Sequence, residues 1–302
     1  MLTTLRAAAM AWTVFVFPAV VFSQAQPNTT FSPVVKGLVL QDVEYSEFHS
    51  KFTGHDYHVY VSLPASYRQG DRRYPVLYVP DHEIAFLAMN ITKDILTSPP
   101  AAVEEFILVG VPLKSETLAD WSRKRTFDFT PTEVEAKNKS LSQSLGGEVH
   151  TGGASMFLRT LKEELIPYIE SKYRANSDRG LAGYSAGGLF AAYVWLNDSN
   201  TFSRYLVGSS GDWDNGVLLK TEAALAKSGK TLHGRVFISV GSDEEDEDVG
   251  AFKNLTTAIT SHAYPNLRLE SHVFESTDHR SGALGAFFSG LKFLYALPQA
   301  NR

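Results

Sequence analysis

Short apolar runs alternate with amphipathic stretches along most of the chain. The runs are rich in β-branched and aromatic residues and are bounded by Gly, Pro, Asp or Asn, a pattern that predicts strands. They cover residues 37–47, 56–63, 76–79, 106–111, 179–184, 205–208, 235–240 and 267–274. Several are continuously apolar, as expected for parallel strands that are covered on both faces. The first two runs are candidates for an antiparallel edge of the sheet.

Apolar residues recur at helical spacing between the predicted strands. Residues 154–173 carry a stripe with a period of about 3.6 residues. The stripe consists of Phe157, Leu158, Leu161, Leu165, Ile166 and Ile169. Further helices are predicted at residues 83–97, 186–196, 217–227, 251–263 and 281–297.

Strands that alternate with helices predict a single α/β domain, with a mostly parallel central sheet and helices on both faces. The polar segment 113–145 has too little apolar surface to join that sheet. We therefore expect this segment to form a long excursion over the sheet.

The N-terminal segment has the pattern of a secretory signal. Arg6 supplies a positive charge, residues 7–22 are almost continuously apolar, and residues 23–25 form a small-residue cleavage site. The alternative is an uncleaved anchor, but the apolar run is shorter than the roughly 20 residues that span a bilayer. We expect a secreted or periplasmic protein that is not held in a membrane after cleavage. The predicted organisation is a signal segment at 1–25, a linker at 26–35 and a catalytic domain at 36–302.

Composition and charge narrow the class of function. The chain has 302 residues, with 28 basic and 33 acidic side chains and a net charge of −5. Because the charge is mildly negative and no basic run occurs, we expect no nucleic-acid partner. The absence of cysteine excludes disulfides, thiolate metal sites and a cysteine nucleophile. His55 and His58 have the spacing of a metal-ligand pair but lack a third ligand nearby, so we expect neither a metal nor another cofactor.

The sequence Gly183-Tyr184-Ser185-Ala186-Gly187 matches G-x-S-x-G, the signature of a nucleophilic serine. It lies between a predicted strand and a predicted helix, where the serine occupies a strained turn that exposes its hydroxyl above the sheet. Gly183 and Gly187 leave room for this turn to pack closely. The alternative is a phosphate-binding loop, but the chain lacks the glycine patterns of Walker and dinucleotide-binding loops. We therefore assign Ser185 as the nucleophile.

A serine in such a turn needs a histidine later in the chain, with an acid between them. His279 follows the strand predicted at 267–274, at the edge of the sheet where catalytic loops gather. We therefore assign His279 as the general base. The other histidines after Ser185 lie before a strand, in a helix or inside a strand, and they are His233, His262 and His272.

The acid has several candidates. The strand predicted at 235–240 leads into six consecutive acids at 243–248. One of the first three is expected to reach the imidazole and fix its tautomer. We favour Glu244, with Glu245 and Asp243 as alternatives. Asp278 is a weaker candidate, because neighbouring residues such as Asp278 and His279 seldom face each other.

Acyl transfer through a serine also needs two N–H groups that stabilise the oxyanion. One is expected to be the backbone N–H of Ala186, directly after the nucleophile. The other is expected from the loop that follows the strand at 76–79. Pro80 has no N–H, so the donor is expected at His82 or Glu83.

These motifs occur with others that resemble one family, the "putative esterase" family of α/β-hydrolases. It includes esterase D, enterobactin (siderophore) esterases, feruloyl esterases and mycolyl transferases. In this chain His82 replaces a glycine of the family's first segment, and Gly211 and Asp212 also depart from its pattern. The resemblance covers roughly residues 56–297 and is carried by 75–81 (PVLYVPD), 125–131 (RTFDFTP), 152–174, 183–188, 208–215 (GSSGDWDN), 279–282 and 290–294.

The resemblance implies a carboxylic ester hydrolase of the siderophore-esterase type that acts on a small-molecule ester. It supports the roles of Ser185 and His279, and it implies that Arg125, Asp128 and Trp213 line or brace the substrate pocket. Some siderophore esterases work with a Ser–His pair alone, so the acid stays open. Two alternatives to hydrolysis also stay open: an acyltransferase with the same residues, and a non-catalytic binding protein on a hydrolase scaffold. The sequence predicts neither the particular ester nor an oligomeric state.

Overall fold

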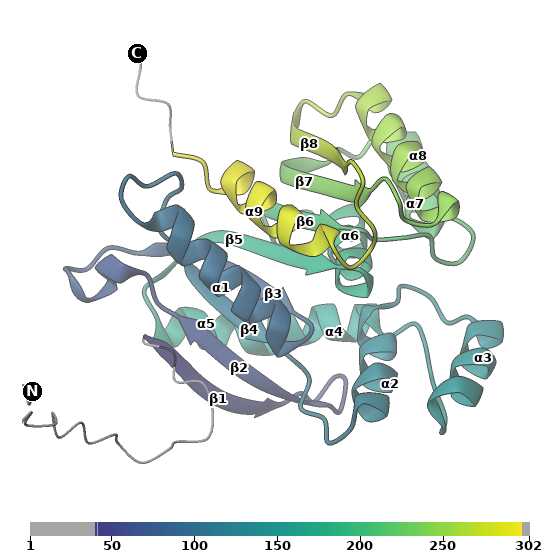
Figure 1. Ribbon diagram of the computed structural model, residues 1–302, viewed down its shortest axis with the longest axis horizontal. Helices are drawn as coiled ribbons and strands as arrows, with labels where there is room; N and C mark the ends of the chain where they lie inside the picture. The colour runs from purple at the N-terminus through teal and green to yellow at the C-terminus, as the bar shows by residue number, and fades with distance from the viewer. Residues whose placement is uncertain (1–39, 41, 298–302) are drawn as a thin grey trace, which may run out of the picture. The chain divides into compact units, whose positions relative to one another are not determined.

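The predicted strands pair into one sheet in the computed structural model, which describes residue 40 and residues 42–297 (Figure 1). The strand order is β1-β2-β4-β3-β5-β6-β7-β8. Strands β3 to β8 run parallel to one another, whereas β2 is antiparallel to both of its neighbours, β1 and β4. The predicted antiparallel edge is therefore confirmed. The strands are Val43–His49, Asp56–Ser62, Tyr74–Pro80, Ile107–Val111, Ala175–Tyr184, Arg204–Gly208, His233–Gly241 and Asn266–Phe274.

Side chains of the sheet alternate between two hydrophobic clusters, one on each face. In β3, Val76 and Tyr78 belong to one cluster, and Leu77 and Val79 belong to the other. Helices α1 (Glu83–Thr97) and α9 (Gly282–Leu294) cover the face of Leu77 and lie side by side in Figure 1. The opposite face packs against α4 (Ala154–Thr160), the π-helical segment η2 (Leu161–Leu165), α5 (Ile166–Lys172), α6 (Ala186–Asn197), α7 (Val217–Lys227) and α8 (Asp246–His262).

The polar excursion expected at 113–145 contains two helices that the apolar pattern did not predict. They are α2 (Leu118–Phe129) and α3 (Glu135–Leu145). Helix α2 buries only residues near its end, and α3 buries none, so neither has a continuous apolar stripe. The start of α2 is fixed by a cap instead, because Thr117 Oγ1 accepts a hydrogen bond from the Asp120 N–H at 3.1 Å.

Helix α8 begins at Asp246, earlier than the apolar pattern indicated. Its first turn holds Asp246, Glu247 and Asp248, whose negative charge suits the positive end of the helix dipole. Residues 154–173 are helical as predicted, but the π-helical segment interrupts the α-helix. A short 3₁₀ helix, η1 (Ala65–Arg68), follows β2.

The parallel strands end at one edge of the sheet, and the loops that follow them carry the polar residues of interest. Asp81 follows β3, Ser185 follows β5, Ser209 follows β6, Glu244 follows β7 and His279 follows β8. The carboxyl edge of the parallel strands is therefore where an active site is expected. Within residues 40 and 42–297, no helix is long and apolar enough to cross a membrane. The predicted signal segment lies outside the described residues.

Candidate active site

Ser185 lies at the sharp turn between β5 and α6, where the motif placed it. Its backbone has φ 59° and ψ −129°, outside the regions that non-glycine residues favour. The Ser185 N–H donates to the Gly208 carbonyl at 2.9 Å, and the Ser185 carbonyl accepts from the Leu189 N–H at 2.9 Å. A Cβ atom at Gly183 would lie 2.0 Å from the Gly187 carbonyl oxygen, so only glycine fits there. These contacts hold the serine in a strained conformation that exposes its hydroxyl.

The Ser185 hydroxyl lies next to His279, and His279 lies next to Glu244. The distance from His279 Nε2 to Ser185 Oγ is 3.0 Å, and the distance from His279 Nδ1 to Glu244 Oε2 is 2.7 Å. The imidazole is 45% exposed, whereas the carboxylate side chain is 1% exposed. When Nδ1–H donates to the carboxylate, the lone pair of Nε2 faces the serine hydroxyl. This arrangement can accept a proton from the serine.

Three hydrogen bonds hold the carboxylate of Glu244. Its Oε1 accepts from the Gly241 N–H at 2.7 Å and from the Ser209 hydroxyl at 2.6 Å, while Oε2 faces His279. Ser209 is itself 3% exposed. A buried carboxylate is costly unless it is hydrogen-bonded, and these three donors offset the cost of burying this one.

The alternative acids make other contacts. Asp243 accepts from the Ser242 hydroxyl at 2.7 Å, and Glu245 is an exposed residue at the start of α8. Asp278 accepts from the Ser281 hydroxyl at 2.6 Å and from its N–H at 2.8 Å. These bonds, led by the one from the Ser281 hydroxyl, hold the pKa of Asp278 below its usual range. Of the four candidate acids, all of which lie within residues 42–297, Glu244 is the one in contact with His279.

Tyr184 supports the loop that carries His279. Its hydroxyl donates to the His279 carbonyl at 2.9 Å, and its ring centroid lies 5.4 Å from that of the imidazole. The other side of the ring meets Phe287 of α9 edge-on at 6.1 Å. Burial raises the pKa of Tyr184 to about 12, so its hydroxyl stays protonated and keeps donating at neutral pH.

The loop after β3 is held against the nucleophile turn. Asp81 has φ 102°, and Arg125 Nε and Nη2 donate to its two carboxylate oxygens at 2.7 Å each. A Cβ atom at Gly187 would lie 3.1 Å from Asp81 Oδ2, so the carboxylate rests on the first turn of α6. Ala186 begins α6 and Glu83 begins α1, so neither N–H has an acceptor within its own helix. Both predicted oxyanion donors are therefore free of helical hydrogen bonds.

The side chain of His82 is engaged elsewhere. Its Nδ1 accepts from the Ile84 N–H at 3.2 Å and caps α1, and its ring meets Trp121 edge-on at 5.3 Å. His82 and Glu83 line a separate hollow of about 240 Å³ and do not line the pocket around Ser185. The side chains of His82 and Glu83 therefore lie outside the wall of the Ser185 pocket.

A pocket of about 460 Å³ opens around Ser185 and His279. Trp213 lies in its wall, where Trp213 Nε1 donates to Thr132 Oγ1 at 3.1 Å and Lys137 Nζ lies 4.2 Å from the ring centroid. The polar excursion supplies further lining residues, namely Thr126 of α2, Thr130 directly after α2, and Leu141 of α3. The excursion therefore forms one side of the pocket.

Arg125 and Asp128 lie behind this pocket and do not line it. Asp128 is fully buried and accepts from His55 Nδ1 at 3.0 Å and from the Tyr57 hydroxyl at 2.7 Å. Burial raises the pKa of Asp128, although the bonds from His55 and Tyr57 oppose that effect. The Arg125 guanidinium lies 5.1 Å from the centroid of the Trp121 ring. Both residues brace α2, and of the three residues taken from the family pattern only Trp213 lines the pocket.

The remaining histidines have separate partners. His55 contacts Asp128, and His58 Nδ1 lies 2.9 Å from the Tyr45 hydroxyl. His262 is the last residue of α8, and its Nδ1 lies 2.6 Å from Glu222 Oε1. In the part of the chain that the structure describes, no group of three or more His, Cys, Asp or Glu side chains is placed to hold a metal ion.

A match to a family model extends over most of the chain. The family is described as "Putative esterase", and the matched residues are 50–292. The chain belongs to this esterase family. Its membership confirms the resemblance seen in the sequence motifs, and the observed sheet confirms the predicted mostly parallel α/β fold.

Several known proteins are similar to this esterase-family chain. Ferri-bacillibactin esterase BesA of Bacillus subtilis is 31% identical over 166 residues, which cover 54% of this chain and 57% of BesA. The apo-salmochelin esterase of Escherichia coli O6:H1 is 25% identical over 230 residues, which cover 74% of this chain and 70% of that protein. The crystal structure of the BES protein from Bacillus cereus superposes with a TM-score of 0.76 at 27% identity, over 87% of this chain and 100% of that one.

Some residues around Ser185 were not predicted from the sequence. Ser209, Tyr184 and Asp81 contact the proposed catalytic groups or the loop beside them. Ser209 and Asp81 each follow a parallel strand directly, so the rule that located His279 could also have indicated them. The pairing of Asp81 with Arg125 leaves no signal in a single sequence.

Proposed function

We propose that this protein is a serine hydrolase that cleaves carboxylic esters of small molecules without a cofactor. The observation that supports this proposal most directly is the chain of contacts from Ser185 to His279 to Glu244, at 3.0 Å and 2.7 Å. The nucleophile is a serine of G-x-S-x-G in a strained turn between a strand and a helix, as this chemistry requires.

In the proposed mechanism, His279 Nε2 takes the proton of the Ser185 hydroxyl as Ser185 Oγ attacks the ester carbonyl carbon. Glu244 accepts from His279 Nδ1–H, which fixes the tautomer and stabilises the imidazolium that forms. The imidazolium then protonates the departing alkoxide, and the acyl group remains on Ser185. Water, deprotonated by His279, attacks this acyl-enzyme, and the imidazolium protonates Ser185 Oγ as the bond to the acyl group breaks and the carboxylic acid is released.

The tetrahedral intermediate carries a negative oxygen that needs hydrogen-bond donors. We assign these donors to the backbone N–H groups of Ala186 and of His82 or Glu83. Ala186 and Glu83 each begin a helix, so their N–H groups lie at the positive end of a helix dipole.

The names of the relatives suggest the first substrates to test. BesA is named as an esterase of ferri-bacillibactin, and the Escherichia coli relative as an esterase of apo-salmochelin. The BesA alignment spans little more than half of each chain, so the activity of BesA is not taken over directly. We propose siderophore esters as a substrate class for this protein. We also propose that residues 1–25 act as a signal segment and that the protein is secreted or periplasmic. Sequencing the N-terminus of exported protein would test that proposal, with a start at Gln26 expected.

Labelling with a fluorophosphonate tests the proposed hydrolase. Purified protein is treated with the probe while the hydrolysis of 4-nitrophenyl acetate is followed, and Ser185→Ala is treated in parallel. We expect both labelling and turnover to disappear in the variant, because the probe reacts with an activated serine. A well-folded wild-type protein that neither labels nor turns over would refute the proposed function. Release of acid rather than of a new ester, when an alcohol is added, would separate hydrolysis from acyl transfer.

A further inference from the structure

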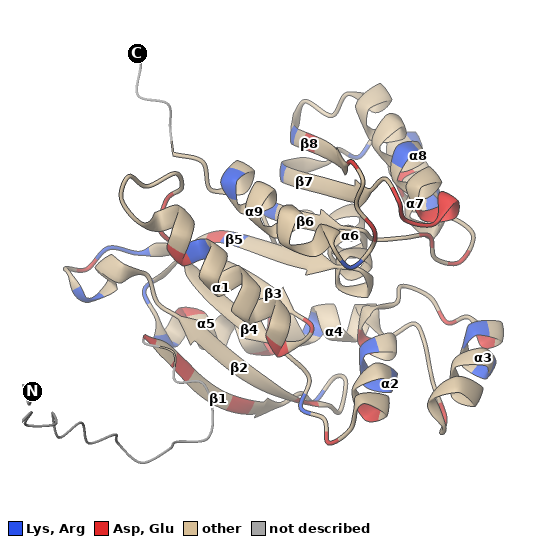
Figure 2. Cartoon of the chain, viewed as in Figure 1, with Lys and Arg blue, Asp and Glu red and all other residues tan. Residues whose placement is uncertain are grey.

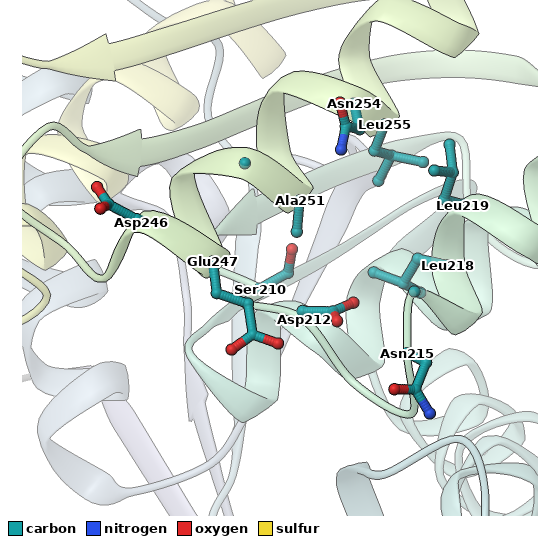
Figure 3. Close-up of a pocket in the computed structure, with 13 residues that line it drawn as sticks. Ser210, Asp212, Asn215, Leu218, Leu219, Asp246, Glu247, Ala251, Asn254 and Leu255 are labelled. Atoms are coloured by element: carbon teal, nitrogen blue, oxygen red, sulfur yellow. The ribbon is translucent and has the colours of Figure 1, made fainter.

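A second cavity of about 420 Å³ lies next to the pocket around Ser185 (Figure 3). Three residues of the loop between β6 and α7 line both cavities: Ser210, Gly211 and Asp212. The rest of the second cavity is formed by Asn215 and Gly216 of the same loop, by α7 and by the first turns of α8. A substrate that reacts at Ser185 therefore has a second hollow immediately across this loop.

The second cavity combines an apolar wall with hydrogen-bonding groups. Figure 3 shows the carboxylates of Asp212 and Glu247 at the same opening, with Asn215 and Asn254 toward its two ends. All of these side chains can accept hydrogen bonds. The apolar part of the wall consists of Leu218, Leu219, Ala251 and Leu255.

No cationic side chain lines the second cavity to balance its negative charge. None of its 13 lining residues is Lys, Arg or His. The ion pairs of the described residues include neither Asp212, Asp246 nor Glu247. Figure 2 shows acidic residues gathered where the chain enters α8. The amino end of α8 contributes roughly half a positive charge, which a single carboxylate outweighs.

We propose that this cavity is a second substrate-binding lobe for the part of the ester beyond the scissile bond. The group it accepts is largely apolar and is uncharged or carries an ammonium, and an anionic group is disfavoured. Its volume falls within the range of small-molecule sites, and its apolar wall supplies the burial that binding needs. The carboxylates and amide oxygens accept from an N–H or O–H of the ligand, whereas a ligand carboxylate is repelled. This proposal rests on the proposed function, because the lobe serves catalysis only if Ser185 is the nucleophile.

A matched set of esters tests both the size and the charge of the accepted group. The reference for the acyl side is 4-nitrophenyl acetate, whose acyl group has only two carbons, and the reference for the alcohol side is ethyl acetate. Three 4-nitrophenyl esters extend the acyl side with equal chains: hexanoate, 6-aminohexanoate and hydrogen adipate. Acetate esters of hexanol, 6-aminohexanol and 6-hydroxyhexanoate extend the alcohol side in the same way. In at least one series, we expect kcat/KM for the ammonium and methyl ends to exceed that for the carboxylate end by about tenfold at low salt.

Gly250 allows the cavity to be filled without damage to the helix. It lies in α8, lines the second cavity, and a Cβ atom there would meet nothing within 4 Å. Gly250→Trp fills the cavity, and Gly250→Ala is the control, since alanine favours the helix by about 1 kcal/mol but adds little volume. We expect Gly250→Trp to lower kcat/KM for the favoured long esters by about tenfold, with the short reference ester of the same series within about twofold of wild type.

Glu247→Gln tests the charge without filling the cavity. We expect it to reduce the preference for ammonium over carboxylate ends by about threefold, and added salt to reduce the wild-type preference similarly. This measurement also keeps the test decisive if Gly250→Trp does not fold.

The outcomes separate the two proposals. If 4-nitrophenyl acetate is hydrolysed in a Ser185-dependent way, but neither series shows a charge preference or a loss in Gly250→Trp, the second lobe is refuted and the hydrolase stands. If the anionic esters are preferred, the assigned ligand class is wrong. If hydrolysis of the acetate does not depend on Ser185, the proposed function itself fails.

Discussion

Arg125 holds Asp81 through two parallel hydrogen bonds, from Nε to Oδ1 and from Nη2 to Oδ2, each at 2.7 Å. Asp81 is 9% exposed and has φ 102°, in the region that residues other than glycine rarely occupy. The planar fork of the guanidinium fits both carboxylate oxygens at once. The pair therefore links α2 to the loop that carries one of the proposed oxyanion donors.

Loss of the Arg125–Asp81 pair is expected to lower kcat and to change KM little. Arg125→Lys keeps the charge but cannot make both bonds, so the loop at His82 and Glu83 shifts. We expect kcat for 4-nitrophenyl acetate to fall by roughly tenfold to a hundredfold with little change in KM. Lys124→Ala is the matched control, since Lys124 forms an i,i+4 pair with Asp120 on the same helix. Equal effects of the two substitutions would show that Arg125 does not position the loop.

The proposed nucleophile and base are expected to act as one unit. Ser185→Ala and His279→Ala should each lower kcat by about 10⁴-fold or more, and the double variant should cost little further. Non-additivity follows because the base has no function without the hydroxyl that it deprotonates. The test is to measure kcat of each purified variant in a stopped assay. Circular dichroism checks that each variant is folded. If the loss of kcat in the double variant equals the product of the two single losses, the two residues do not share a step.

Among the acids of the loop after β7, only Glu244 is expected to matter for the rate. Glu244→Gln should lower kcat by about 10³-fold to 10⁴-fold, because the amide can stabilise neither the imidazolium nor the required tautomer. Asp243→Asn and Glu245→Gln remove neighbouring charges and should retain activity within about threefold. A near-normal rate for Glu244→Gln would indicate that Ser185 and His279 work as a pair without an acid.

Ser209 is expected to act by positioning Glu244. Its hydroxyl donates to Glu244 Oε1 at 2.6 Å in a buried setting, and Ser209→Ala leaves that oxygen with only the Gly241 N–H. We expect kcat to fall by about tenfold, in line with the loss of one hydrogen bond to a charged group. Ser209→Thr keeps a hydroxyl at this position and is the matched control. A change in stability with an unaltered kcat would point to a purely structural role.

The buried carboxyl of Asp128 is expected to make stability depend on pH. Burial raises the pKa of Asp128 above its ordinary value of 3.8, so the folded protein holds this proton to higher pH than the unfolded chain does. The contribution of Asp128 to the free energy of unfolding is therefore greatest below its ordinary pKa of 3.8. That contribution is lost as the pH rises through the pKa of Asp128 in the folded protein. His55, Tyr57 and Lys124 partly offset the loss by favouring the carboxylate.

Asp128→Asn removes this titration and can keep both hydrogen bonds. Its Oδ1 can accept from the Tyr57 hydroxyl, and its Nδ2 can donate to a ring nitrogen of His55 that carries no proton. Urea unfolding of both proteins from pH 3.5 to pH 7 is the measurement, and we expect the variant to lose less stability than wild type as pH rises. Parallel curves would contradict the assigned shift.

The strands and the three proposed catalytic residues could be predicted because each depends on a local pattern. Ser185 lies in a turn that its neighbours define, and His279 and Glu244 follow strands whose apolar runs are plain in the sequence. Parallel strands end at the same edge of a sheet, so the residues that follow them can be expected to lie close together. The contact from Glu244 to His279 nevertheless needed the structure, because six adjacent acids offered the same signal.

The helices of the polar excursion could not be predicted from apolar spacing. Helix α3 has no buried residue and α2 buries only Asp128 and Phe129, so neither shows a stripe. Arg125 was expected near the substrate because of its family motif, whereas its partner Asp81 is 44 positions earlier in the chain. Contacts of this kind are set by tertiary packing, and one sequence does not record them.

The last described part of the chain supplies two things. It provides the base of the proposed site, and it covers one face of the sheet. His279 follows β8, and α9 adds Leu291 and Leu294 to the cluster that also contains Leu77. Just beyond α9, the Tyr295 ring stacks on Phe106 at 4.1 Å. During synthesis on the ribosome, Ser185 therefore emerges long before its base and before the hydrophobic face is closed. A growing or stalled chain would carry a serine without the means to activate it, so ester cleavage can begin only after the chain has been synthesised through α9.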